Sequence, residues 1–145
     1  MPANSNRLHT ALIACSAAHK KCSMQEFQKF NLTTGQPKVL ALLSQKEGCL
    51  QKDLAARCHV EPATMTSILS NMSDKELIFK KQELVSGGKR AYSIYLTEKG
   101  HAMAAKVNQI VDDVEDISFR DFDDSEKQLL IRLLNRVQTN LENNT

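Results

Sequence analysis

The sequence lacks the long apolar segment that a membrane protein or a secreted precursor carries. The apolar stretch near the N-terminus, residues 11–18, is short, and Cys15 and Ser16 interrupt it. A membrane-spanning helix needs about 20 consecutive apolar residues, and a secretory leader needs a continuous apolar core. We therefore expect a cytoplasmic protein that does not engage a membrane.

Motifs of catalysis are also missing. The sequence contains no Ser-His-Asp spacing, no glycine-rich phosphate loop and no paired-carboxylate motif. Such patterns position a nucleophile, a phosphate group, or a general acid and base. The acidic pairs at residues 112–113 and 123–124 are typical of a solvated helix face and a helix cap. We therefore expect no enzyme, no catalytic residue and no cofactor.

Cysteine is present four times, as Cys15, Cys22, Cys49 and Cys58, and we expect reduced thiols because the cytosol does not sustain structural disulfides. Cys15, His19 and Cys22 share one helix face, since they are four and three residues apart. They could supply metal ligands or a redox-sensitive thiol. The favoured interpretation is that Cys15 and Cys22 continue an apolar stripe as small buried residues, without a metal site.

The net charge of +2 hides an uneven distribution. Residues 1–96 hold 13 of the 19 Lys and Arg and 7 of the 17 Asp and Glu, which gives +6. Residues 97–145 hold the other 6 basic and 10 acidic residues, which gives −4. A polyanion is bound largely through Lys, Arg and backbone donors, so the basic part is the candidate nucleic-acid surface.

Apolar residues spaced by three and four predict helices along the first half of the chain. The length of 145 residues and the 41% hydrophobic content suit one compact domain. A long helix is expected over residues 6–30. Thr33 and Gln36 form a capping-box pattern for a second helix, which should end at Gly48. Pro37 falls in its first turn, where its missing amide costs little.

Two short helices and a hairpin follow. The helices are expected over residues 53–57 and 62–75, with a tight turn at residues 58–60. After Leu77 the period changes to two, which predicts two strands around a glycine-containing tip at residues 86–90. The fold class is therefore mainly α with a small β-hairpin wing.

Two long helices complete the chain. Thr97 is expected to cap the first of them. Asp123 and Glu126 form a capping-box pattern for the second. The apolar stripe of the last helix is too broad for a helix that stands alone, and it consists of Leu129, Leu130, Leu133, Leu134, Val137 and Leu141.

This order of elements resembles the MarR family of bacterial regulators, and local motifs support the resemblance over residues 32–100. Leu32-Thr33-x-x-Gln36 is similar to the opening signature of the family, and Gln51-Lys52-Asp53-Leu54-Ala55-Ala56-Arg57 is similar to its helix before the turn. Pro62-Ala63-Thr64-Met65-Thr66 is similar to the start of its recognition helix. Ile94-x-Leu96-Thr97-Glu98-Lys99-Gly100 is similar to its exit from the wing. The flanking helices match in length and pattern only.

The resemblance implies a winged helix-turn-helix at residues 32–96, with residues 1–31 and 97–145 as helical dimerisation regions of the same compact domain. It implies a homodimeric transcriptional regulator, expected to be a repressor, on a palindromic DNA operator. Each recognition helix would enter a major groove and each wing a minor groove. The broad stripe on the last helix supports the dimer independently, because an apolar face of that width needs a partner.

Candidate DNA contacts follow from the helix faces and the wing. Met65, Ile68, Leu69 and Met72 should face the core. The predicted DNA-binding residues are Gln51, Lys52, Ala63, Thr64, Thr66, Ser67, Ser70, Asn71, Lys89 and Arg90. Hydroxyl groups can bind phosphates or bases, and Arg90 suits the narrow minor groove best. Solvated helix and loop residues are the simpler alternative for these positions.

Four positions depart from the family pattern. Gly88 stands where the family usually has the Asp that orients the wing arginine, so we expect a looser wing. His59 and Glu76 stand where the family usually has glycine, and we expect changes in local geometry there. Ser67 replaces a basic residue that is common in the middle of the recognition helix.

The resemblance also implies a small effector, often a phenolic or aromatic carboxylate, bound where the first helix meets the DNA-binding unit. His9, Ile13 and Ser16 are the candidate effector residues, although His9 is better explained as a surface residue. Two alternatives stay open. One is a thiol- or metal-responsive regulator with the same DNA-binding unit, and the other is a winged helix used for protein–protein assembly.

Overall fold

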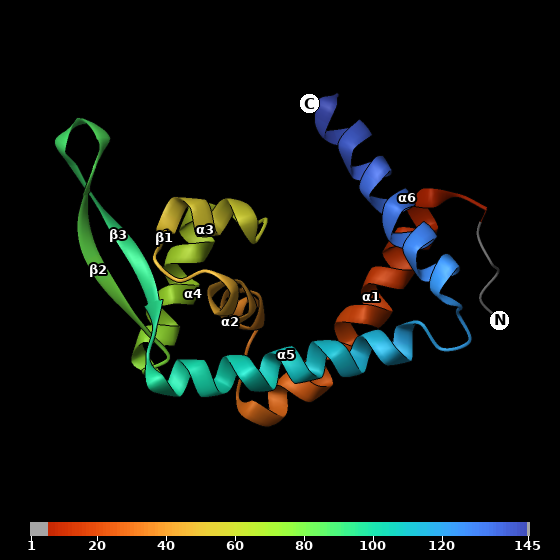
Figure 1. Cartoon of the computed structure of the whole chain (residues 1–145), viewed down its shortest axis with the longest axis horizontal. Helices are drawn as coiled ribbons and strands as arrows, with labels where there is room; N and C mark the ends of the chain where they lie inside the picture. The colour runs from red at the N-terminus through yellow and green to blue at the C-terminus, as the bar shows by residue number, and fades with distance from the viewer. Residues whose placement is uncertain (1–5, 145) are drawn as a thin grey trace.

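A computed structural model describes residues 6–144 as a mainly helical chain with one small antiparallel sheet (Figure 1). The expected fold class, mainly α with a β-hairpin wing, is confirmed. The elements are α1 (Leu8–Phe27), the 3-10 helix η1 (Gln28–Phe30), α2 (Gln36–Gln45), β1 (Cys49–Leu50), α3 (Gln51–Arg57), α4 (Pro62–Asp74), β2 (Ile78–Val85), η2 (Ser86–Gly88), β3 (Lys89–Leu96), α5 (Glu98–Ser118) and α6 (Asp124–Asn143).

The long helix α5 connects two groups of elements. Figure 1 shows α2, α3, α4 and the hairpin gathered near one end of α5, and α6 beyond the other end. The sheet has the order β1-β3-β2, so that β3 is its central strand. The hairpin of β2 and β3 projects away from the helices. Within residues 6–144, none of the helices combines the length and the apolar character needed to cross a membrane.

A single core unites helices α1 to α5 and the root of the hairpin. Met65, Leu69 and Met72 of α4 are buried in it, as expected from their spacing, whereas Ile68 is half-buried and approaches Gly35. Burying a side chain of this size stabilises the fold by about 1.5–3 kcal/mol. The other large apolar side chains that are fully buried are Leu32, Val39, Leu40, Leu43, Leu54, Leu77, Ile94 and Val107.

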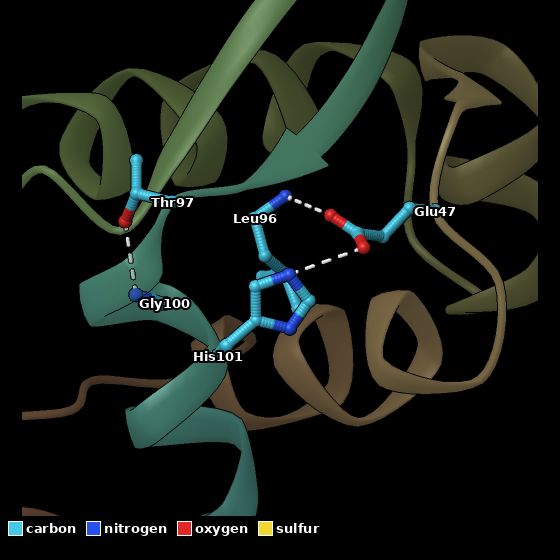
Figure 2. A network of polar contacts seen from close by, with 5 residues as sticks. All are labelled: Glu47, Leu96, Thr97, Gly100 and His101. Atoms are coloured by element: carbon cyan, nitrogen blue, oxygen red, sulfur yellow. Dashed lines mark hydrogen bonds and ion pairs between the residues drawn. The ribbon is translucent and has the colours of Figure 1, made fainter.

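Glu47 links the end of the hairpin to α5 (Figure 2). Its Oε1 accepts a hydrogen bond from the Leu96 amide at 2.7 Å, and its Oε2 lies 3.1 Å from His101 Nε2. Thr97 caps α5 as expected, because its Oγ1 accepts from the Gly100 amide at 2.9 Å. One carboxylate therefore holds the last residue of β3 and the first turn of α5 together. The capping box of Asp123 and Glu126 at α6 is also confirmed.

The turns after α3 and α4 keep the left-handed geometry of a Schellman motif without glycine. His59 has a φ of 56° and Glu76 a φ of 61°. In each turn the next amide donates to a carbonyl five residues earlier, at 3.0 Å in both cases. The expectation that these substitutions change local geometry is wrong, because the hydrogen bonds of the turn outweigh the steric cost of a Cβ at positive φ.

The start of α2 differs from the expected capping box. α2 begins at Gln36, and its N-cap is Gly35 rather than Thr33. Only half of the pattern forms: Gln36 Oε1 accepts from the Thr33 amide at 3.1 Å. The same oxygen accepts from Lys75 Nζ at 3.0 Å, and Gln36 is 1% exposed. A tertiary contact to the end of α4 thus sets the position of Gln36, which sequence spacing could not reveal.

Other boundaries also shift. The helix expected over residues 6–30 changes to a 3-10 turn after Phe27. The second helix ends at Gln45 before Gly48, and the short strand β1 was not predicted. Lys89 and Arg90 lie in β3 rather than in the hairpin tip, which consists of Ser86–Gly88. Two successive glycines at positive φ close the turn earlier than expected.

Glycine at position 59 or 76 should stabilise the protein. The His59→Gly and Glu76→Gly variants should each raise the free energy of unfolding by about 0.5–1.5 kcal/mol, because they remove a Cβ from a left-handed residue. Thermal and urea unfolding measure the change. Asn31→Gly is a matched control with a smaller expected gain, since Asn31 has a φ of 59° and asparagine tolerates this region. His59→Ala should give no gain, and equal stabilisation by alanine would contradict the explanation.

Candidate nucleic-acid interface

α4 presents opposite faces to the core and to solvent. Its buried face consists of Met65, Leu69 and Met72. All six residues predicted to contact DNA from this helix are exposed, namely Ala63, Thr64, Thr66, Ser67, Ser70 and Asn71. None of them carries a formal charge. The surface can therefore form hydrogen bonds and van der Waals contacts with phosphates and base edges, but no ion pairs.

Thr66 connects the exposed face of α4 to the start of α3. Its hydroxyl group donates to the Pro62 carbonyl at 3.1 Å and accepts from Gln51 Nε2 at 3.0 Å. The hydroxyl proton is therefore engaged within the protein. Within residues 6–144, no side chain forms a hydrogen bond with Gln51 Oε1. The neighbouring Lys52 is exposed. Thr66 orients Gln51, and the pair offers an amide oxygen and a methyl group to a ligand.

Arg90 lies on one face of the hairpin, opposite Leu84 in the register of β2 and β3. Its Nη1 donates to Gln82 Oε1 at 3.2 Å. Gly88 has no side chain and adopts a φ of 72° at the end of the tip. The hydrogen bond from Arg90 therefore goes across the strands rather than to a residue two positions earlier.

The hairpin carries an excess of positive charge. Its one acidic side chain, Glu83, accepts from Ser93 Oγ at 2.8 Å and from Tyr95 Oη at 3.2 Å. Partial burial and the hydrogen bond to Glu83 raise the pKa of Tyr95 above its ordinary value, which already lies well above neutral pH. The basic side chains of the hairpin are Lys80, Lys81, Lys89 and Arg90. This distribution favours a polyanion.

A cavity of about 500 Å³ lies between α1, α2 and α5. Apolar side chains form part of its wall, and His19, Lys20, Lys38 and Glu115 add charged or polar groups. Of the three candidate effector residues, Ser16 lines this cavity. His9 and Ile13 are exposed on α1 and are not among its lining residues. A cavity of this size and composition suits a small amphipathic molecule.

The cysteines differ in their surroundings. Cys15 is exposed, so the expectation that it lies buried in an apolar stripe is wrong for this chain on its own. Cys22 is half-buried against the core. Burial raises the pKa of the Cys58 thiol, which disfavours the reactive thiolate there. Among residues 6–144, no three His, Cys, Asp or Glu side chains converge on a point that could hold a metal ion.

Comparison with known proteins finds similarity to one family of regulators. Residues 32–84 match the model of the MarR family. The uncharacterized HTH-type transcriptional regulator YybA of Bacillus subtilis (strain 168) is 25% identical over 117 residues, which cover 81% of this chain and 77% of YybA.

Over residues 32–84 this chain is therefore similar to the MarR family.

Solved structures of MarR-type regulators have the same fold. A putative MarR family regulator from Listeria monocytogenes, complexed with a 26mer DNA, has a TM-score of 0.86 at 21% identity, covering 97% of this chain and 92% of that one. The PcaV regulator of Streptomyces coelicolor, in complex with its natural ligand, has a TM-score of 0.78 at 18% identity, covering 96% and 98%. The expected winged helix-turn-helix is confirmed. The MarR family and these relatives are transcriptional regulators, so the prediction that the chain is not an enzyme is also confirmed.

Sequence reasoning missed two contributors to the MarR-type surface. Gln82 bonds to Arg90, and Glu47 holds the end of β3 against α5. Strand alternation could have placed Gln82 on the face of Arg90 once the tip had been assigned to Ser86–Gly88. No local signal marks Glu47, because its partners lie about 50 residues further along the chain.

Proposed function

We propose that this protein is a sequence-specific DNA-binding repressor, which acts as a homodimer on a palindromic operator and is released by a small aromatic or phenolic effector. The observation that carries the proposal is the exposed hydroxyl-rich face of α4 beside a hairpin whose only acid is engaged in the protein. The DNA complex of the Listeria monocytogenes relative supports the same use of the fold.

DNA recognition would divide between α4 and the hairpin. α4 would enter the major groove with its hydroxyl groups and Asn71 toward bases and phosphates. Gln51, held by Thr66, would contact the DNA at the start of α3, with Lys52 beside it. Lys89 and Arg90 would enter the minor groove, where a guanidinium suits the negative potential. Selectivity would then depend more on DNA shape and phosphate position than on charged base contacts.

The homodimer is supported by the apolar surface of α6. Most of its stripe is exposed in the single chain: Leu129, Leu130, Leu133, Leu134 and Leu141 have exposed fractions of 41–60%, and Val137 is half-buried. Soluble proteins rarely leave an apolar face of this extent in water. Pairing through α6 and α1 would cover it. Two-fold symmetry would place the two α4 helices about one DNA turn, ~34 Å, apart on a palindromic site.

The cavity between α1, α2 and α5 is the proposed effector site. Lys38 of α2 can pair with a carboxylate, while Met24, Phe27 and Val107 can contact an aromatic ring. α2 belongs to the DNA-binding unit and α1 to the proposed dimer region. An effector that binds better to one arrangement of these helices would shift the population toward a spacing that no longer fits DNA.

Operator binding should depend on Arg90 and on the hydroxyl group of Thr66. We expect Arg90→Ala to weaken binding to a duplex selected from a random pool by about 10–30-fold. The salt slope, which is the slope of the logarithm of the binding constant against the logarithm of the salt concentration, should become smaller in magnitude by about one. Thr66→Val should weaken it by about 5–10-fold, since Gln51 loses its acceptor, while Thr66→Ser should stay within about twofold. Fluorescence anisotropy at several KCl concentrations measures the affinity and the salt slope of each variant. Arg120→Ala, an exposed arginine between α5 and α6, is the control. Salt-independent binding would favour the assembly module instead.

The oligomeric state should depend on the stripe of α6. Sedimentation of the wild-type protein at micromolar concentration should give the mass of two chains. Leu134→Asp should raise the dissociation constant by at least about 100-fold, because it puts a charge into an apolar contact. Thr139→Asp, on another face of the same helix, should remain dimeric. A wild-type protein that sediments as a monomer would exclude the dimer.

Effector binding should depend on Lys38. We expect benzoate and 2-hydroxybenzoate to bind in the cavity and to weaken operator binding, with calorimetry as the first measurement and anisotropy as the second. Lys38→Met should weaken the binding of these carboxylates by about fivefold or more and that of neutral phenol much less, since only the carboxylate loses an ionic partner. Lys46→Met, just beyond the end of α2, is the matched control. Equal loss for phenol and benzoate would reject Lys38 as the carboxylate partner.

A further inference from the structure

We infer that Gln82 is the positioning residue for Arg90, and that it orients the guanidinium without neutralising its charge. This inference rests on the proposed function of the hairpin as a minor-groove reader. The direct observation is the hydrogen bond of 3.2 Å from Arg90 Nη1 to Gln82 Oε1. Both side chains are exposed, so the contact leaves the arginine accessible to DNA.

The register of the hairpin brings these two side chains together. Arg90 pairs with Leu84, and Gln82 pairs with Tyr92, so Gln82 and Arg90 share one face on diagonal positions. Diagonal Cβ atoms in an antiparallel pair are roughly 7–8 Å apart, a distance that two long side chains can bridge. Lys80 lies next along the same face, with its Nζ 5.7 Å from the centre of the Tyr92 ring.

No carboxylate of the hairpin is available for this role. Gly88, two residues before Arg90, has no side chain. Glu83 is the only acidic residue within β2 and β3, and it lies on the opposite face, where Ser93 and Tyr95 donate to it. An uncharged amide oxygen is therefore the acceptor that the described hairpin offers to Arg90.

An amide and a carboxylate have different consequences for DNA binding. Guanidinium has five N–H donors, so the bond to Gln82 leaves most of them for the groove. The charge of Arg90 stays uncompensated and adds to that of Lys80 and Lys89. Gln82 should therefore affect the orientation of Arg90, and with it affinity and flank preference, while leaving the number of phosphate charges neutralised unchanged. The salt slope reports that number.

A double-mutant comparison separates positioning from a direct contact. The variants are Gln82→Met, which keeps the shape without the acceptor, Arg90→Met and the double variant, all assayed as full-length protein on the selected operator at several KCl concentrations. Gln82→Met should weaken binding about 3–10-fold with an unchanged salt slope. Arg90→Met should weaken it further and lower the slope by about one. In the Arg90→Met background, Gln82→Met should have no further effect.

Two further variants complete the test. Gln82→Glu should retain the preference for A·T-rich flanks over G·C-rich flanks but lower the salt slope, because a carboxylate partly neutralises Arg90. Gln45→Met, an exposed glutamine at the end of α2, is the control and should bind as the wild type does. A Gln82→Met effect that persists undiminished in the Arg90→Met background would overturn the positioning role alone. An Arg90→Met variant that binds as the wild type does would overturn the proposed use of the wing as well.

Discussion

The burial of one face of α4 is the constraint on which the other features of the surface depend. Met65, Leu69 and Met72 pack into the same core as Ile94 and Leu96 of the hairpin. This packing fixes the rotation of α4 about its axis, and so it decides which hydroxyl groups are exposed. It also fixes the root of the hairpin relative to α4. The two parts of the candidate DNA surface are therefore held by one set of apolar contacts, because closely packed interiors do not deform gradually.

α5 connects this core to the opposite end of the molecule. Its N-terminal turn is tied to the end of β3 through Glu47, and its buried side packs against α2 and α1. The cavity lies where these three helices meet. Under the proposed function, a ligand there would contact both the DNA-binding unit and the dimer region. The proposed effector response thus needs no long pathway, only a different fit between adjacent helices.

Hydrogen bonds hold the local geometry of this chain at three positions where the resemblance predicts other residues. Backbone hydrogen bonds hold His59 and Glu76 in left-handed turns that usually contain glycine. Gln82 provides an acceptor for Arg90 where Gly88 offers none. A local backbone hydrogen bond in each turn, and a side-chain hydrogen bond across the strands of the wing, replace the preference of a single residue. The cost is conformational strain in the turns and a neutral rather than ionic contact on the wing.

The sequence by itself determined the order of the long helices and of the hairpin, the caps at Thr97 and Asp123, the exposed face of α4 and the resemblance to the MarR family, because these depend on local spacing and turn chemistry. The candidate positions on α4 and on the wing followed from the same spacing. Only the tertiary structure decided the start of α2, the short strand β1, the cavity and the partners of Glu47, Thr66 and Arg90. Those features arise where segments distant in the sequence, or on facing strands, approach one another, and periodicity carries no information about such contacts.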